Sequence, residues 1–167
     1  AVESAVLLKN ADDILPLAAK SKVALIGDFA FEPRYQGAGS SMVNATFVET
    51  MEKTIGNYDL QVVGTSRGYK RTGEADEELK KEALDIAQNA DVVIYCFGLD
   101  ELSESEGLDR THMRIPQNQI ELLEELVKIN ANVVGILSAG SAIEMPWQNC
   151  CKAILHGYLT GQAGTSA

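Results

Sequence analysis

Short apolar runs alternate along this chain with longer segments in which apolar side chains recur every three or four positions. The runs are bounded by polar residues, a pattern typical of strands buried on both faces of a parallel sheet. We expect strands at 22–27, 60–64, 91–97, 132–137 and 152–156.

The longer segments predict helices near 46–56, 75–89 and 117–129. Residues 1–8 are interpreted as the end of a helix, and 161–167 as the beginning of another. Strands that alternate with helices predict an α/β fold with right-handed crossovers. We therefore expect a three-layer sandwich, with a mostly parallel sheet of about five to six strands and helices on both faces.

Composition narrows the choice of partners. The chain has 167 residues, of which 46% are hydrophobic, and this suits one domain with a real core. The net charge of −10 has no basic stripe to offset it, so we expect neither nucleic acid nor a membrane surface as a partner. An uncharged or polar small ligand remains compatible with this charge.

The cysteines indicate no cross-linked framework. Cys96 lies in an expected strand, and Cys150 and Cys151 are neighbours, so neither a disulfide pattern nor a zinc spacing is present. We expect buried, reduced thiols and no metal. Unpaired thiols favour a reducing compartment such as the cytoplasm, although the sequence assigns no compartment.

Five acidic side chains occupy the loop 98–110, directly after an expected strand. Ligands of open α/β sheets collect at this edge. The loop lacks the regular spacing of a calcium loop, and a plain solvated loop is one interpretation of it. The other is an acid/base site, for which Glu106 is the natural candidate, with Gly107 allowing close approach to a ligand and Arg110 ordering Asp109. Composition does not choose between them.

A second loop, 36–41, is rich in glycine and serine and follows the first expected strand. It has neither a dinucleotide-binding nor a Walker pattern, which argues against a nucleotide-binding domain. It either helps to frame a polar ligand or is a plain loop whose glycines adopt unusual backbone angles. Just before it, Arg34 and Tyr35 are candidates for sugar contact or for anchoring the loop.

Three further side chains invite a structural interpretation. His112 is expected at the surface, although it follows Arg110 closely enough to line a pocket. His156 is expected to be a hydrogen-bonded core histidine, and Trp147 is expected to pack in the core rather than stack on a sugar.

Several segments in succession resemble the carboxy-terminal α/β sandwich domain of glycoside hydrolase family 3, the β-glucosidase and β-xylosidase family. The most specific is Glu-Gly-x-Asp-Arg, which runs here from Glu106 to Arg110. The segments that carry the resemblance, in chain order, are 4–10, 15–17, 23–27, 37–41, 90–94, 98–99, 104–110, 115–119, 133–140 and 161–164.

The resemblance implies a retaining exo-acting β-glycosidase that hydrolyses O-glycosidic bonds and needs no cofactor. It assigns the general acid/base to Glu106, with Glu104 as the rival. Residues expected to contact a β-linked glucoside or oligosaccharide are Ser40, Ser41, Asp109 and Arg110.

In the family, an amino-terminal barrel of the same parent chain supplies the Asp nucleophile, and a barrel alone takes about 250 residues. We therefore expect 1–167 to be one sandwich domain of a longer enzyme, with the barrel absent, the carboxyl end truncated and no activity in isolation. A non-catalytic sugar-binding or scaffolding α/β domain is the alternative.

Overall fold

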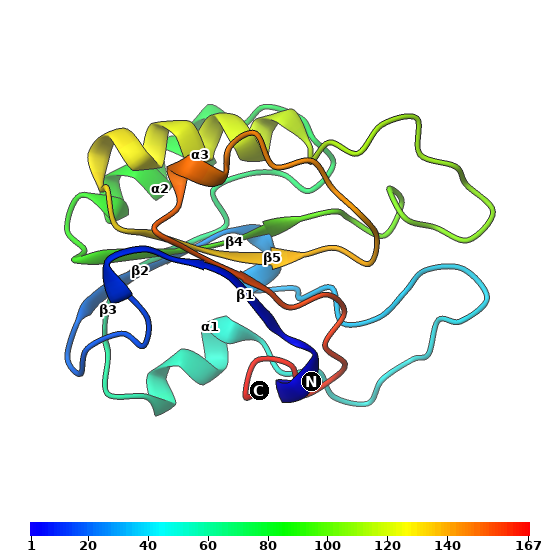
Figure 1. The fold of residues 1–167 in the computed structure, drawn as a ribbon, viewed down its shortest axis with the longest axis horizontal. Coiled ribbons are helices and arrows are strands. Elements are labelled where there is room, and N and C mark those ends of the chain that lie inside the picture. The colour runs from blue at the N-terminus through cyan, green and yellow to red at the C-terminus, as the bar shows by residue number, and fades with distance from the viewer.

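A computed structural model describes residues 1–167, which form one six-stranded sheet in the order β1-β6-β5-β4-β2-β3 (Figure 1). All neighbouring strands are parallel except the edge strand β1, which is antiparallel to β6. The strands are β1 (Val6–Asn10), β2 (Lys22–Ile26), β3 (Gln61–Ser66), β4 (Val92–Gly98), β5 (Val133–Ser138) and β6 (Ala153–His156).

Helices cover both faces of the sheet. Helices α2 (Glu77–Ala87) and α3 (Gln117–Ile129) lie side by side over one face, and the short α1 (Met51–Thr54) lies beyond the other (Figure 1). The three-layer α/β sandwich expected from the alternating pattern is confirmed. None of the helices combines the length and the apolar character that a membrane crossing requires.

The core lies on both faces of the central strands, under the paired helices on one side and around Phe29 and Ile55 on the other. Every residue of β4 is buried, which explains why this strand appears in the sequence as a continuous apolar run. Helix α3 buries Leu122, Leu123 and Leu126 at helical spacing. Helix α2 begins where the Asp76 side chain accepts a hydrogen bond from the backbone N–H of Leu79 at 3.1 Å.

Three expectations about the less regular segments were wrong. Residues 1–8 contain a 3₁₀ turn (Val2–Ser4) and then β1, not a helix end, because the free edge of β6 offers backbone partners to a short apolar run. The helix expected near 46–56 begins only at Met51, where the Thr50 side chain caps it. The segment 162–166 forms turns rather than the start of a helix.

All three cysteines are free thiols, and two of them are buried in the core. Cys96 and Cys151 are buried, and burial raises the pKa of each thiol to about 12. Cys150 is half-buried. The expectation of buried, reduced thiols therefore holds for Cys96 and Cys151 and only in part for Cys150.

The order of the strands decides where a ligand can collect. From β2 the chain passes outward to β3, then returns to pair β4 on the other side of β2 and continues away through β5 and β6. The loops that follow β2 and β4 therefore leave adjacent strands in diverging directions, and such a switch point is where open α/β sheets bind ligands. Both loops extend beyond the same end of the sheet (Figure 1).

Candidate active site

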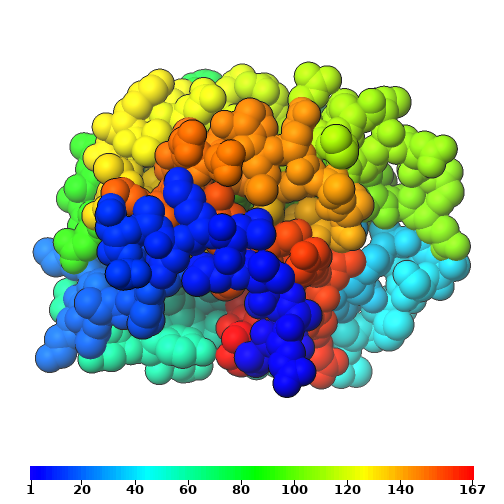
Figure 2. Space-filling model, viewed as in Figure 1, coloured from blue at the N-terminus to red at the C-terminus, as the bar shows by residue number.

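The loop after β2 and the loop after β4 are held together away from the sheet. Ala38 and Ser105 form an isolated parallel bridge between them. Figure 2 shows the cyan and yellow-green loops meeting along one side of the molecule. A cavity of about 490 Å³ lies at this meeting place, and its lining includes Ser40, Ser41 and both candidate carboxylates, Glu104 and Glu106.

Glu106 is exposed, and the hydrogen bonds to its carboxylate come from a single residue. The backbone N–H of Ser40 donates to Glu106 Oε2 at 2.7 Å, and the Ser40 hydroxyl donates to the same oxygen. These two bonds, the hydroxyl first, lower the pKa of the Glu106 carboxyl below its ordinary value, with burial opposing them weakly. The carboxylate is thus anchored while staying accessible from the cavity.

Gly39 explains why the first loop needs glycine. Its φ is +92°, and a Cβ at this position would lie 2.5 Å from Glu106 Cβ. Both the backbone conformation and the space therefore require the absence of a side chain. Of the two interpretations of the glycine-serine loop, the unusual backbone angle is found, and the loop also frames the cavity.

Glu104 stands two residues away in the opposite environment. Its side chain is only 7% exposed, and it accepts hydrogen bonds from Arg34 and from the Ser141 hydroxyl. The Gly140 N–H adds a third at 2.8 Å. Burial raises the pKa of the Glu104 carboxyl, but the bonds from Ser141, Gly140 and Arg34 outweigh it, so the net pKa is lowered.

Arg34 is an anchor. Its side chain is 1% exposed, and its Nη1 donates both to Glu104 and to the Leu99 carbonyl oxygen at 3.1 Å. Tyr35 lies further out, where its hydroxyl donates to the Val43 carbonyl oxygen at 3.2 Å. Of the two roles considered for Arg34, sugar contact and loop anchoring, the structure shows loop anchoring.

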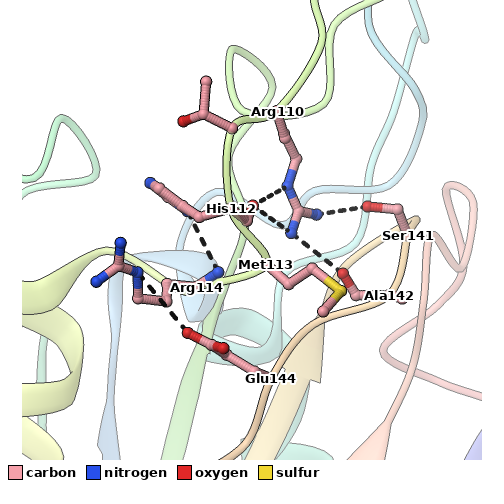
Figure 3. A pocket seen from close by; sticks show the side chains of 8 residues that line it. Arg110, His112, Met113, Arg114, Ser141, Ala142 and Glu144 are labelled. Atoms are coloured by element: carbon pink, nitrogen blue, oxygen red, sulfur yellow. Dashed lines mark hydrogen bonds and ion pairs between the residues drawn. The ribbon is translucent and has the colours of Figure 1, made fainter.

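The sequence predicts that Arg110 orders Asp109, and this prediction is wrong. The Arg110 guanidinium turns instead toward the segment after β5, where it donates to Ser141 Oγ at 2.6 Å and to the Ala142 carbonyl oxygen at 3.1 Å (Figure 3). Those partners, with the His112 carbonyl oxygen, use the donors that would have reached Asp109. Asp109 is exposed and lines a separate cavity of about 330 Å³.

The structure therefore brings together four of the expected site residues, places Arg110 at their border, 3.7 Å from Glu104, and sets Asp109 apart. Ser40, Ser41, Glu104 and Glu106 share one cavity, while Arg110 borders an open depression of about 770 Å³ with His112, Arg114 and Glu144 (Figure 3). No group of three or more His, Cys, Asp or Glu side chains is arranged to hold a metal ion.

Sequence reasoning missed the part played by Gly140 and Ser141. Both follow β5, whose carboxyl end lies beside that of β4, and this position was the available signal. The structural roles expected for two other residues hold. His156 is buried with Nδ1 3.2 Å from the Leu137 carbonyl oxygen, and Trp147 packs edge-on against Phe97 at 4.8 Å between ring centroids.

Known proteins share this architecture. Residues 5–167 match the glycosyl hydrolase family 3 C-terminal domain. The chain is 45% identical over 167 residues to thermostable beta-glucosidase B of Acetivibrio thermocellus, covering 98% of this chain and 22% of that protein. It is 43% identical over 178 residues to an exo-alpha-(1->6)-L-arabinopyranosidase of Bifidobacterium breve, covering 100% of this chain and 23% of that protein.

A solved structure agrees with these relatives. The crystal structure of a GH3 beta-glucosidase from Bifidobacterium adolescentis superposes with a TM-score of 0.91 at 44% identity. The match covers 99% of this chain and 24% of that one. The chain thus spans about a quarter of the length of the proteins it matches.

Proposed function

We propose, because this chain belongs to the glycosyl hydrolase family 3 C-terminal domain family, that it carries the general acid/base of a retaining exo-acting β-glycosidase. Glu106 is the proton-transferring group in this proposal. The observation that carries it is the contrast between the two carboxylates of one loop. Glu106 faces the cavity and is bound only through Ser40, whereas Glu104 is enclosed by Arg34, Ser141 and Gly140.

The chemistry needs an accessible carboxyl group that can both lose and regain a proton. In a retaining mechanism, Glu106 would protonate the leaving oxygen while a second carboxylate, about 5–5.5 Å away, attacks the anomeric carbon. Glu106 would then take a proton from the water that releases the sugar. Glu104 is a poor nucleophile because its oxygens are already occupied by buried donors. The nucleophile belongs, in this proposal, to the amino-terminal barrel of the same parent chain, so residues 1–167 are inactive alone.

The pKa of Glu106 supports this dependence on a second module. The Ser40 donors favour the ionised form, while a general acid must be protonated when the substrate binds. A barrel that closes over the loop would remove water from Glu106 and place another carboxylate near it. Both changes raise a carboxyl pKa.

The surface around the two loops supports the same arrangement. Six large apolar side chains of these loops and the segments beside them are exposed, including Leu102 at 77% and Val43 at 65%. Exposed apolar groups on loops that meet favour a contact surface more than singly scattered ones do. The six are Met42, Val43, Phe47, Leu102, Leu108 and Met113.

The substrate in this proposal is a β-linked glucoside or oligosaccharide. One relative is named a beta-glucosidase, and another of nearly equal identity is named an arabinopyranosidase, so the sugar must be tested directly. Ser40 and Ser41 line the cavity beside Glu106, and Asp109 and Arg110 lie on neighbouring surfaces. We propose contact with the substrate for all four.

The test uses the full-length polypeptide that contains this domain, assayed on 2,4-dinitrophenyl β-glucoside and on the matching α-L-arabinopyranoside. Glu106→Ala should lower kcat/KM for an alkyl or sugar leaving group by about 10²–10⁴-fold. Azide should restore turnover of the activated substrate and yield a glycosyl azide, because the small anion replaces the water that Glu106 would deprotonate.

Glu104→Ala is the contrasting variant. It should lose activity on the alkyl or sugar leaving group, because it leaves the Arg34 charge buried, but azide should yield no glycosyl azide because the Glu106 carboxylate is still present. An unimpaired Glu106→Ala enzyme would show that the proposal is wrong and favour a non-catalytic sugar-binding domain. Turnover by residues 1–167 alone would contradict the requirement for the barrel.

A further inference from the structure

We propose that Arg34 and Glu104 form a positioning pair that sets the reach of Glu106 toward the substrate. The inference deepens the proposed function and rests on it. It assigns neither residue a contact with the sugar. Their part is to lock the loop after β2 against the loop after β4, so that Ser40 and Glu106 meet at the cavity.

The first observation is the burial of the pair. The side chains of Arg34 and Glu104 are 1% and 7% exposed, and Glu104 is the only carboxylate that pairs with Arg34. Removing Glu104 would leave Arg34 as an uncompensated buried charge, and removing Arg34 would leave Glu104 with only Arg110, 3.7 Å away, as a counter-ion. The pair is therefore stiff in a way that exposed ion pairs are not.

The second observation is the register of the two loops. The pair Arg34–Glu104, the bridge Ala38–Ser105 and the contact Ser40–Glu106 follow one another in the same direction along both loops. The Arg34–Glu104 ion pair is the contact nearest the sheet in this series, and the Ser40–Glu106 contact is the farthest from it. A shift at the ion pair is therefore transmitted through Ser105 to the neighbouring Glu106.

The third observation is that Glu104 reaches a third loop. Its carboxylate accepts from the Gly140 N–H and the Ser141 hydroxyl, both after β5, and Arg110 Nη1 lies 3.7 Å away. Arg34 adds a bond to the Leu99 carbonyl oxygen at the base of the loop after β4. One carboxylate thus ties together the segments that follow β2, β4 and β5.

The charge of Glu104 can be removed with little change in the shape of its side chain. Glu104→Gln keeps the volume of the side chain but leaves the Arg34 guanidinium without its counter-ion. The loops should then separate at the end nearest the sheet, and Glu106 should lose its alignment with the leaving oxygen. Small misplacements of a catalytic group lower rates by up to about 10²-fold.

The experiment compares two substrates of the full-length polypeptide. A methyl or disaccharide glycoside needs proton donation to its leaving oxygen, whereas 2,4-dinitrophenolate leaves without it. We expect Glu104→Gln to lower kcat/KM on the first substrate by roughly 10- to 100-fold and on the second by less than about threefold. The ratio of the two values is unaffected by the fraction of folded enzyme, so a variant that is only unstable leaves it unchanged.

A double-mutant cycle identifies the two residues as one unit. Arg34→Gln should reproduce the selective loss, and the double variant should be no worse than either single variant, because the pair is already broken. The matched control is Glu144→Gln, which removes a carboxylate from an exposed ion pair with Arg114. Its ratio should equal that of the unmodified enzyme.

Each outcome separates this inference from the proposed function. If Glu106→Ala shows the selective loss while Glu104→Gln keeps the normal ratio, the positioning role is wrong and the proposed function stands. An equal loss of Glu104→Gln on both substrates also overturns the positioning role. If Glu106→Ala itself keeps the normal ratio, the proposed function is wrong and the inference falls with it.

Discussion

Ser40 directs both of its hydrogen-bond donors, the backbone N–H and the hydroxyl, at one oxygen of Glu106. The two residues are 66 positions apart in the sequence and meet because β2 and β4 are adjacent strands. Donors on a carboxylate favour its ionised form. Ser40 therefore assists the step in which Glu106 has given up its proton and opposes the step in which Glu106 must hold it.

Ser40→Ala should raise the pKa of Glu106 toward its ordinary value of 4.5, because the hydroxyl is the largest cause that lowers it. The sign follows from the loss of a donor that stabilises the charged form. The measurement is an NMR titration of the Glu106 carboxyl carbon in the unmodified and variant domain. In the full-length enzyme, the alkaline limb of kcat/KM should move to higher pH, since the acid stays protonated longer.

Ser41→Ala is the matched control for this titration. Ser41 lines the same cavity, but it makes no hydrogen bond to Glu106. Its removal should leave the Glu106 titration where it is. Equal titrations for Ser40→Ala and the unmodified domain would contradict the account of Ser40.

Gly39→Ala should lower kcat/KM, whereas Gly73→Ala, which introduces the same backbone strain, should not. Both glycines have positive φ, +92° and +87°, so backbone strain alone costs each variant about 1–2 kcal/mol of folding free energy, and the contact with Glu106 adds to that cost at Gly39. A Cβ at Gly73 meets open space, whereas one at Gly39 lies 2.5 Å from Glu106 Cβ. Only Gly39→Ala should therefore displace Glu106 and lower kcat/KM, by about tenfold or more.

Urea unfolding and steady-state kinetics on both glycine variants check this prediction. The folding free energies report the shared backbone strain together with the added cost at Gly39, and the kinetics report the contact that only one variant disturbs. Equal activity in the two variants would mean that the loop moves away from Glu106 without consequence.

Much of the fold could be predicted from local pattern. The strands β2, β4 and β5 are continuous apolar runs, and α3 matches its expected range, because burial on one or both faces leaves a periodic trace in the sequence. The edge strand β1 is a short apolar run with mostly exposed side chains, so its local pattern does not distinguish a strand from a helix end. Its pairing with β6, which lies far along the chain, leaves no signal in the local sequence.

The residues of the site likewise fall into those that the local sequence marked and those that only the strand order brings together. Glu106 and the glycine-serine loop were marked by composition, by their place after a strand and by the family resemblance. The pairing of Arg34 with Glu104 spans 70 positions, and that of Ser141 with Glu104 spans 37. Such contacts follow from the strand order, so they became visible only once β2, β4 and β5 were placed side by side.

Gln119 connects this architecture to the base of the acidic loop. It is fully buried in α3, and its Oε1 accepts from the Gly98 N–H at 2.9 Å, where β4 ends. Gln119→Leu fills the same space but leaves that N–H without its acceptor, so we expect a loss of about 1–3 kcal/mol of folding free energy. Chemical unfolding measures the loss, and faster amide hydrogen exchange at Gly98 would place it at the end of β4.

Gln117→Leu makes the same chemical change on the exposed surface of the same helix. It should alter the folding free energy by no more than about 0.5 kcal/mol and leave exchange at Gly98 unchanged. Because both substitutions change helix propensity alike, the difference between them isolates the bond to Gly98. A Gln119→Leu variant as stable as Gln117→Leu would show that the start of the acidic loop is held by the sheet alone.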